Sequence, residues 1–207
     1  MPKSAKAQPG NENAVAKGSL IVISAPSGCG KTTIIERLLK RHPEWVRSIS
    51  VTTRTPRQGE KDGEDYFFVN TQRFHEMEEK KELLESAKVF DRLYGTPRQF
   101  VMKQLEQGRN VLLAIDVQGT RRVKEVLDAG SLITVFILPP SVKVLRERLE
   151  GRNTESPDEI DHRIQVAQDE IKEAGAYDFA VVNQNLEQTI VDIESFIEKK
   201  QKKRGTQ

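Results

Sequence analysis

Residues 20–33 read LIVISAPSGCGKTT, and this stretch decides the fold. An apolar run of strand length opens it, and a turn that contains Gly28 and Gly30 follows. Lys31 and Thr32 then stand where a helical segment begins. Strand, turn and helix in this order direct backbone N–H groups and the positive end of the helix dipole at a polyphosphate. We expect Lys31 to reach the β- and γ-phosphates and the Thr32 hydroxyl to bind Mg²⁺, so the sequence predicts a nucleotide-binding loop.

This loop departs from the usual pattern G-x-x-x-x-G-K-[ST] where Ala25 replaces the first glycine. Alanine is the smallest substitute, and the two later glycines remain. The alternative is an ordinary strand, turn and helix with a chance Gly-Lys pair, but the required order of all the parts favours phosphate binding. Cys29 in the same loop could have a lowered pKa beside Lys31 and a helix N-terminus. A small tolerated residue is the favoured interpretation of this cysteine.

The composition limits the size of the protein and the partners it can have. A chain of 207 residues can hold one α/β domain with an insertion. Lys and Arg number 33 against 31 Asp and Glu, and a net charge of +2 argues against a nucleic-acid-binding surface. No apolar stretch approaches the ~20 residues that span a bilayer, and no signal-peptide pattern opens the chain. We therefore expect no membrane partner and a cytoplasmic protein, which fits the single cysteine.

After the loop, apolar runs of strand length alternate with segments of helical periodicity. The strand-like runs cover residues 110–116, 132–138 and 179–182. The helical segments cover residues 32–41, 118–129, 141–151 and 157–174. Strands that alternate with helices imply a parallel sheet covered on both faces. The predicted fold class is α/β, with a parallel sheet core of the P-loop NTPase type.

Residues 50–98 interrupt this rhythm with turn-rich and β-like stretches, which predict a small α+β insertion. A shorter irregular piece around Arg152 lies between two helices and predicts a lid. The first residues lack any sustained apolar period and predict a disordered tail, and the basic run 199–204 predicts a frayed, solvated helix end. The predicted boundaries are a tail over 1–17, a core domain over 18–49 and 97–207 with its lid at about 146–165, and an inserted domain over 50–96.

The insertion carries residues that suit a second phosphate. Arg54 and Arg57 flank Pro56, and paired guanidinium groups can each donate bidentate hydrogen bonds to phosphate oxygens. On these residues alone, a solvated loop with surface arginines is the favoured interpretation. Asp116 follows a strand-like run, at the carboxyl end where α/β proteins bind their ligands.

Several longer motifs occur in one order along the chain: SAPSGCGKTT, SVTTRTPRQGEKDGEDYFFV, YGTPR, IDVQG, PPSVKVLRERLEGR and VVN. Together they resemble guanylate kinase over residues 19–196. The resemblance implies a P-loop core domain that binds MgATP, an inserted domain that binds GMP, and a lid that closes over the transferred phosphoryl group. It implies direct in-line transfer of the γ-phosphoryl group of ATP to GMP, giving ADP and GDP, with Mg²⁺ as the cofactor and dGMP as a second acceptor.

The resemblance also implies roles for the residues that match the family's motifs. The loop that would bind ATP consists of Ala25, Pro26, Ser27, Gly28, Cys29, Gly30, Lys31, Thr32 and Thr33, with Thr32 on Mg²⁺. The residues that would hold the GMP phosphate are Arg54, Arg57, Tyr66 and Tyr94. Those that would face the guanine are Ser50, Glu85, Thr96 and Asp116. Those that would act on the transferring phosphoryl group are Lys31, Arg148, Arg152 and Arg163.

Two of the guanine residues also have simpler interpretations. Residues 96–99 form a good capping box, so Thr96 could cap a helix, although guanine contact is favoured. Glu85 by itself would be a solvated acid. The chemistry agrees with the resemblance, because guanine N1–H and its exocyclic amine can donate to a carboxylate and its O6 can accept from a hydroxyl.

Two other functions compete with this one. Guanylate-kinase-like modules that hold phosphorylated peptides have degraded ATP loops and accompany partner-binding domains, whereas Lys31 and Thr32 are present here and the chain has no room for further domains. A kinase for a different small acceptor is the other alternative, and Glu85 with Ser50 and Thr96 argues for guanine. The sequence leaves the oligomeric state open, and a homo-oligomer is compatible with it.

Overall fold

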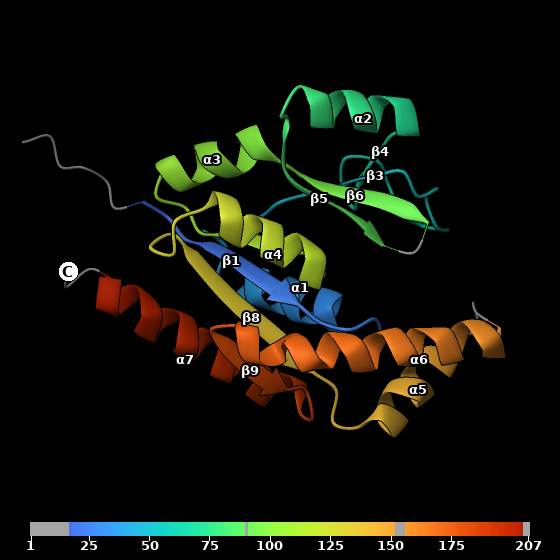
Figure 1. Ribbon diagram of the computed structural model, residues 1–207. Helices are drawn as coiled ribbons and strands as arrows, with labels where there is room; N and C mark the ends of the chain where they lie inside the picture. Colours follow the sequence, from blue (N-terminus) through green and yellow to red (C-terminus); the bar gives the residue numbers. More distant parts are fainter. Residues whose placement is uncertain (1–16, 90, 152–155, 205–207) are drawn as a thin grey trace, which may run out of the picture.

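The computed structural model describes residues 17–89, 91–151 and 156–204. Its core is a five-stranded sheet in which all neighbouring strands are parallel (Figure 1). The strands lie in the order β2 (Val46–Arg47), β7 (Val111–Ala114), β1 (Leu20–Ser24), β8 (Leu132–Leu138) and β9 (Phe179–Val182). The predicted α/β fold with a parallel core is thereby confirmed.

Helices cover both faces of this sheet, because the central strand β1 is apolar on both sides. Ile21 and Ile23 face one core cluster, and Leu20 and Val22 face the other. The first cluster is closed by α1 (Lys31–Arg41), α5 (Val142–Glu150), α6 (Pro157–Lys172) and α7 (Leu186–Arg204). The second is closed by α3 (Arg98–Glu106) and α4 (Val117–Val126). Strands buried on both faces read as continuous hydrophobic runs, which explains the sequence of β1 and β8.

The insertion forms a second, four-stranded sheet in the order β4 (Phe67–Phe68), β3 (Val51–Thr52), β6 (Arg92–Pro97) and β5 (Leu83–Val89). Helix α2 (Thr71–Glu79) covers it and contributes Phe74 to a small core with Val51 and Leu83. Strand β5 also packs against α4, and its Leu84 belongs to the second core cluster of the main sheet. The insertion therefore stands on the core domain through β5, as Figure 1 shows.

The helices and strands differ from the predicted ones chiefly at their ends. Helix α6 stops at Lys172 and continues as a 3₁₀ helix over Glu173–Ala176. Its predicted start is confirmed, because Ser156 and Glu159 form a reciprocal capping box. The strands β2, β3 and β6 were not predicted, since short segments around turns give weak periodic signals.

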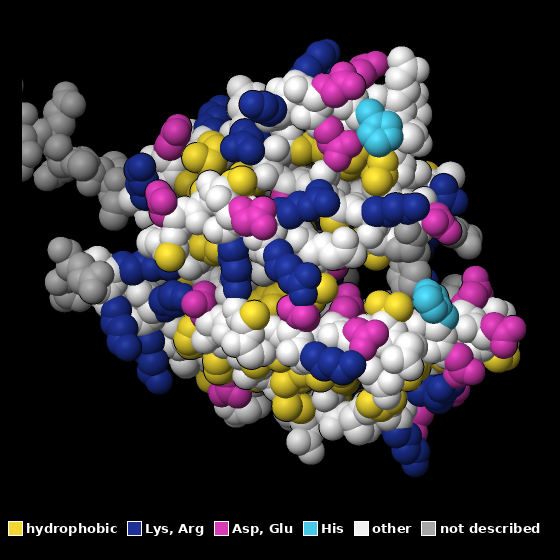
Figure 2. Space-filling view, viewed as in Figure 1, with side chains coloured by type: hydrophobic (Ala, Val, Ile, Leu, Met, Phe, Trp, Pro, Cys, Tyr) yellow, Lys and Arg dark blue, Asp and Glu magenta, His cyan; other side chains and the backbone are white. Residues whose placement is uncertain are grey.

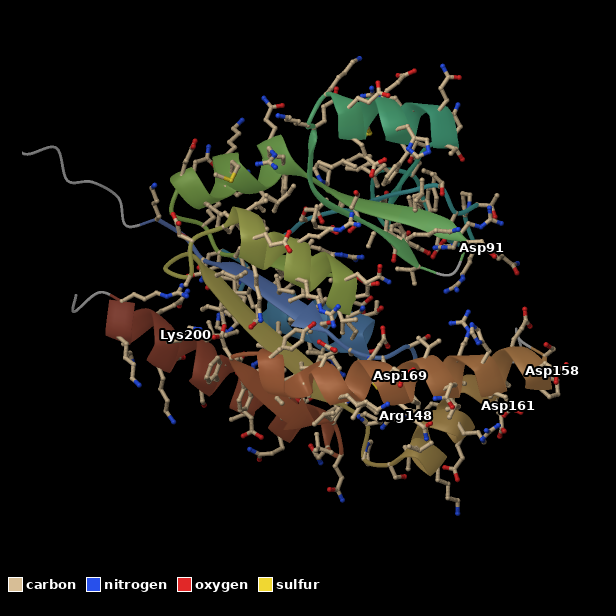
Figure 3. The ribbon with its side chains drawn as sticks, in the orientation of Figure 1. Asp91, Arg148, Asp158, Asp161, Asp169 and Lys200 are labelled. Carbon is tan, nitrogen blue, oxygen red and sulfur yellow. The ribbon has the colours of Figure 1, made fainter. Side chains whose placement is uncertain are left out.

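The prediction of a frayed, solvated helix end over residues 199–204 is wrong in part. These residues belong to α7, and the Arg204 guanidinium donates to the carbonyl oxygens of Ala129 at 3.1 Å and of Leu132 at 2.6 Å. Lys200, labelled in Figure 3, pairs with Asp178. Lys200 and Arg204 thus anchor the end of the helix, whereas Lys199, Lys202 and Lys203 are exposed as predicted. The predicted tail lies outside the described residues except for Lys17, and within the described residues no helix is long and apolar enough to cross a membrane.

Candidate active site

A cleft of about 890 Å³ lies between the core sheet and the insertion. Figure 2 shows the surface hollowed between the insertion and α6, with charged side chains around the hollow. Most residues singled out from the sequence line this cleft. They are Ala25, Pro26, Ser27, Gly28, Gly30, Lys31, Thr32, Thr33, Ser50, Arg54, Arg57, Tyr66, Glu85, Tyr94, Asp116 and Arg163.

The loop from β1 to α1 has a backbone shape that requires glycine. Gly28 and Gly30 have φ angles of 91° and 89°, in the left-handed region that L-residues rarely adopt. A buried hydrogen bond fixes the loop, because the Asn183 amide donates to the carbonyl oxygen of Cys29 at 2.9 Å. Gly30 is the N-cap of α1, and no described side chain caps this helix. Its first N–H groups are therefore available to an anion.

Lys31 lines the cleft, and two carboxylates act on its charge. Its Nζ is 3.4 Å from the carbonyl oxygen of Ile115. Burial lowers the pKa of Lys31, and the charges of Glu170 and Asp116 oppose that change. Burial raises the pKa of Glu170 to about 7, although Lys31 lowers it. A polyphosphate bound here would meet a positive charge already surrounded by low-dielectric walls, where its attraction is strong.

Cys29 takes part in the loop but does not line the cleft. Its side chain is fully buried in the first core cluster. Burial raises the pKa of the thiol to about 12, against the smaller lowering effect of Arg148. The alternative of a reactive, low-pKa thiol is therefore wrong, because burial outweighs the neighbouring charges.

The opposite wall of the cleft holds the two arginines of the insertion. Arg54 donates to both oxygens of Glu60, at 2.8 and 2.9 Å, and its guanidinium lies 5.3 Å from the centre of the Tyr66 ring. The backbone N–H of Arg57 donates to the same carboxylate at 2.7 Å. Tyr66 meets Tyr94 edge to face, with ring centres 6.1 Å apart. A single acid thus orders a loop that carries both arginines.

Glu85 and Thr96 form a buried polar pair beside these residues. The Thr96 hydroxyl donates to Glu85 Oε1 at 2.7 Å, and Glu85 is only 5% exposed. Burial raises the pKa of the Glu85 carboxyl to about 7, against the opposing hydrogen bond from Thr96. The alternatives for both residues are wrong: Glu85 is not solvated, and Pro97 rather than Thr96 is the N-cap of α3.

Asp116 closes the cleft between the two walls. It is the N-cap of α4, and its Oδ1 accepts from the backbone N–H of Gly119 at 2.8 Å. Its charge raises the pKa of Glu85 on one side and of Glu170 on the other, after the larger effect of burial on each. The charge of Asp116 therefore acts on carboxyl groups in both walls of the cleft.

The three arginines assigned to phosphoryl transfer are placed differently. Arg163 on α6 lines the cleft and donates to Ser27 Oγ at 3.1 Å. Arg148 does not line the cleft, and it donates to the carbonyl oxygen of Asn183 at 3.4 Å. In Figure 3 Arg148 lies below α6, while Asp91 lies above it at the end of the insertion. Arg152 lies outside the described residues, as does part of the predicted lid.

The sequence analysis missed several residues of the cleft, among them Glu60, Glu170 and Arg47. Glu60 holds Arg54, Glu170 faces Lys31, and Arg47 lines the cleft with its Nε buried and without a hydrogen-bond partner among the described residues. Glu170 and Arg47 give no local signal, because only the packing of α6 and β2 brings them to the cleft.

Comparisons with known proteins identify the family of this chain. The family model described as guanylate kinase matches residues 17–200. A guanylate kinase of Wolbachia sp. subsp. Brugia malayi is 47% identical over 91% of this chain and 96% of its own length, and one of Clostridioides difficile is 44% identical over 91% of each. The crystal structure of guanylate kinase from Anaplasma phagocytophilum superposes with a TM-score of 0.76 at 33% identity, covering 90% of this chain and 87% of that one.

Proposed function

This chain belongs to the guanylate kinase family and transfers a phosphoryl group from ATP to GMP, and we propose how its cleft divides that work. The loop over residues 25–33 binds the ATP phosphates, with Lys31 on the β- and γ-phosphates. The wall formed by the insertion binds GMP. Residues 18–49 and 97–207 act as the core domain, and residues 50–96 act as the GMP-binding domain.

The wall of the cleft formed by residues 25–33, here called the ATP wall, is suited to Mg²⁺ that enters the cleft together with the nucleotide. The described residues contain no cluster of three or more His, Cys, Asp or Glu that could hold a metal ion by itself. Mg²⁺ in kinases is commonly held by one or two protein oxygens together with substrate phosphates and water. The Thr32 hydroxyl, in the first turn of α1 and lining the cleft, supplies that kind of ligand. The ion would neutralise charge on the β- and γ-oxygens.

The GMP wall combines phosphate and base recognition. Arg54, Arg57, Tyr66 and Tyr94 hold the phosphate, and Ser50, Glu85, Thr96 and Asp116 face the guanine. Charge-assisted hydrogen bonds from guanidinium groups suit a phosphate dianion. The contacts assigned here are to the phosphate and the base and not to the sugar, so dGMP should also be an acceptor. Both nucleotides are cytoplasmic metabolites, and we place the enzyme in the cytoplasm.

The reaction requires positioning rather than a general base. The phosphate of GMP is already ionised, so its oxygen can attack the γ-phosphorus in line once the two substrates are aligned. Arg163 stands beside Ser27 of the phosphate-binding loop, near the boundary of the two walls. Arg148 and Arg152 would join it when the lid closes, and together they offset the charge on the transferring group.

The observation that carries the choice of GMP is the buried carboxyl of Glu85, 5% exposed and fixed by Thr96 at 2.7 Å. Guanine N1–H and its amine can satisfy this group, whereas adenine presents an acceptor at N1 and leaves it unpaired. Sites built on such hydrogen bonds discriminate by about 10⁴ to 10⁵ in kcat/KM.

The test measures ADP release with GMP, dGMP, IMP and AMP as acceptors. We expect GMP and dGMP to be used well, IMP to be intermediate because it lacks the amine, and AMP to be lower than GMP by about 10⁴-fold or more. Comparable kcat/KM values for AMP and GMP would contradict the assignment of Glu85 to guanine.

A further inference from the structure

Gly119, in the first turn of α4, lies against the carboxylate of Glu85. A Cβ atom at Gly119 would be 2.7 Å from Glu85 Oε2 and 3.3 Å from Glu85 Cδ. On its other side it would be 3.3 Å from the Cβ of Ile115. A separation of 2.7 Å is well inside the contact distance of carbon and oxygen, so a side chain at this position would displace one of these neighbours.

The neighbour that must move is the carboxylate itself. Ile115 follows β7 and is packed in the second core cluster, so its Cβ is fixed with the backbone. The Glu85 backbone is fixed in β5, and Oε1 is tied to Thr96 at 2.7 Å. A Cβ at Gly119 would therefore rotate Oε2 away from its place or pull Oε1 from Thr96. Either change alters the orientation of the one buried carboxylate of the GMP wall.

We propose that Gly119 is a positioning residue for guanine selection. Because it has no side chain, it leaves the space in which the Glu85 carboxylate is held in the orientation that accepts hydrogen bonds from guanine. This proposal rests on the proposed assignment of Glu85 to guanine. Gly119 itself does not line the cleft. It acts only through Glu85: the first turn of α4 limits the space around Oε2, and Thr96 of strand β6 holds Oε1.

Stability gives a readout that separates this role from a merely structural one. The φ angle of Gly119 is not in the left-handed region, and glycine inside a helix is less stable than alanine. In Gly119→Ala this gain is opposed by the cost of moving the buried Glu85 carboxylate, so Tm should change little while kcat/KM for GMP falls. A glycine kept only for the helix would show no such loss of acceptor binding.

The experiment compares Gly119→Ala with Gly130→Ala in the full chain. A Cβ at Gly130 meets no atom within 4 Å, so this variant is the matched control. We expect Gly119→Ala to lower kcat/KM for GMP by about 10- to 100-fold, the range for a lost hydrogen bond to a charged group, with an unchanged KM for ATP and little change in Tm. Gly130→Ala should have the same kcat/KM for GMP, the same KM for ATP and the same Tm as the unmodified protein. A Gly119→Ala variant with normal kcat/KM for GMP, or with equal losses for GMP and ATP, would overturn the proposal.

Glu85→Gln and the double variant separate this proposal from the one on which it rests. If Glu85→Gln leaves kcat/KM for GMP unchanged, the assignment of Glu85 to guanine fails, and the proposal for Gly119 fails with it. If Glu85→Gln lowers kcat/KM for GMP, the double variant that also carries Gly119→Ala should have nearly the same kcat/KM for GMP as Glu85→Gln alone. Both changes remove the same contact. Additive losses in the double variant would show that Gly119 acts elsewhere and would overturn the proposal alone.

Discussion

The two walls of the cleft are built by different means. The ATP wall is one continuous stretch, residues 25–33, and it works mainly through backbone N–H groups and a helix N-terminus. The GMP wall is assembled from side chains that lie on or near several strands and at the start of α4, between Ser50 and Asp116. A backbone cradle tolerates a changed side chain such as Ala25. A wall made of side chains depends on each of them and on what holds them.

This difference predicts that the ATP wall has a single side chain whose loss is severe. Lys31→Ala should lower kcat by about 10² to 10³, the range found when one donor to the transition-state charge is removed. The fold should survive, because the only described hydrogen bond of this side chain is the long one to Ile115. ADP release measures the activity and circular dichroism the fold. Near-normal turnover in a folded Lys31→Ala variant would remove Lys31 from the ATP site.

In the GMP wall the loss should instead be shared among several side chains. Arg54→Ala and Arg57→Ala should each raise the KM for GMP by about 10- to 100-fold, as expected for a lost charge-assisted contact of roughly 1.5 to 3 kcal/mol. The KM for ATP should change little. Arg54→Ala also leaves Glu60 without its bidentate partner, so we expect the larger effect there. If either variant raised the KM for GMP and the KM for ATP equally, these arginines would lie outside the GMP site.

The same difference explains what could be predicted from the sequence. The ATP loop needs only local order, so strand, glycines, Lys31 and Thr32 were sufficient to find it. Arg54 and Arg57 were ambiguous by local pattern, and only the family resemblance assigned them. The burial of Glu85 depends on Thr96 across the β5–β6 pair and on Gly119 from α4, which are long-range contacts with no local signal. Glu170 was missed for the same reason, because α6 reaches the cleft only after the sheet has formed.

Two carboxyl groups that line the cleft have a pKa raised to about 7: Glu85 in the GMP wall, and Glu170 of α6, which faces Lys31 of the ATP wall. Their ionisation should have opposite consequences. Glu85 must be ionised to accept from guanine N1–H and the amine, so GMP binding should improve as the pH rises toward 7. Ionised Glu170 places a negative charge beside Lys31, where the ATP phosphates bind, so ATP binding should weaken as the pH rises through 7.

The smallest expected effect is therefore a pair of opposed pH profiles. Below pH 7, kcat/KM for GMP should fall by about tenfold per pH unit, while the KM for ATP should rise modestly above pH 7. The substrate phosphates also titrate, with a pKa of about 6, so the matched controls are Glu85→Gln and Glu170→Gln, which keep that titration and remove one carboxyl each. Glu85→Gln should flatten the GMP profile near pH 7 and leave the ATP profile unchanged, and Glu170→Gln should do the reverse. Because the charge of Asp116 raises the pKa of both carboxyls, Asp116→Asn should move both profiles to lower pH. If either Gln variant flattened both profiles equally, the two walls would titrate as one unit and their division at Asp116 would be wrong.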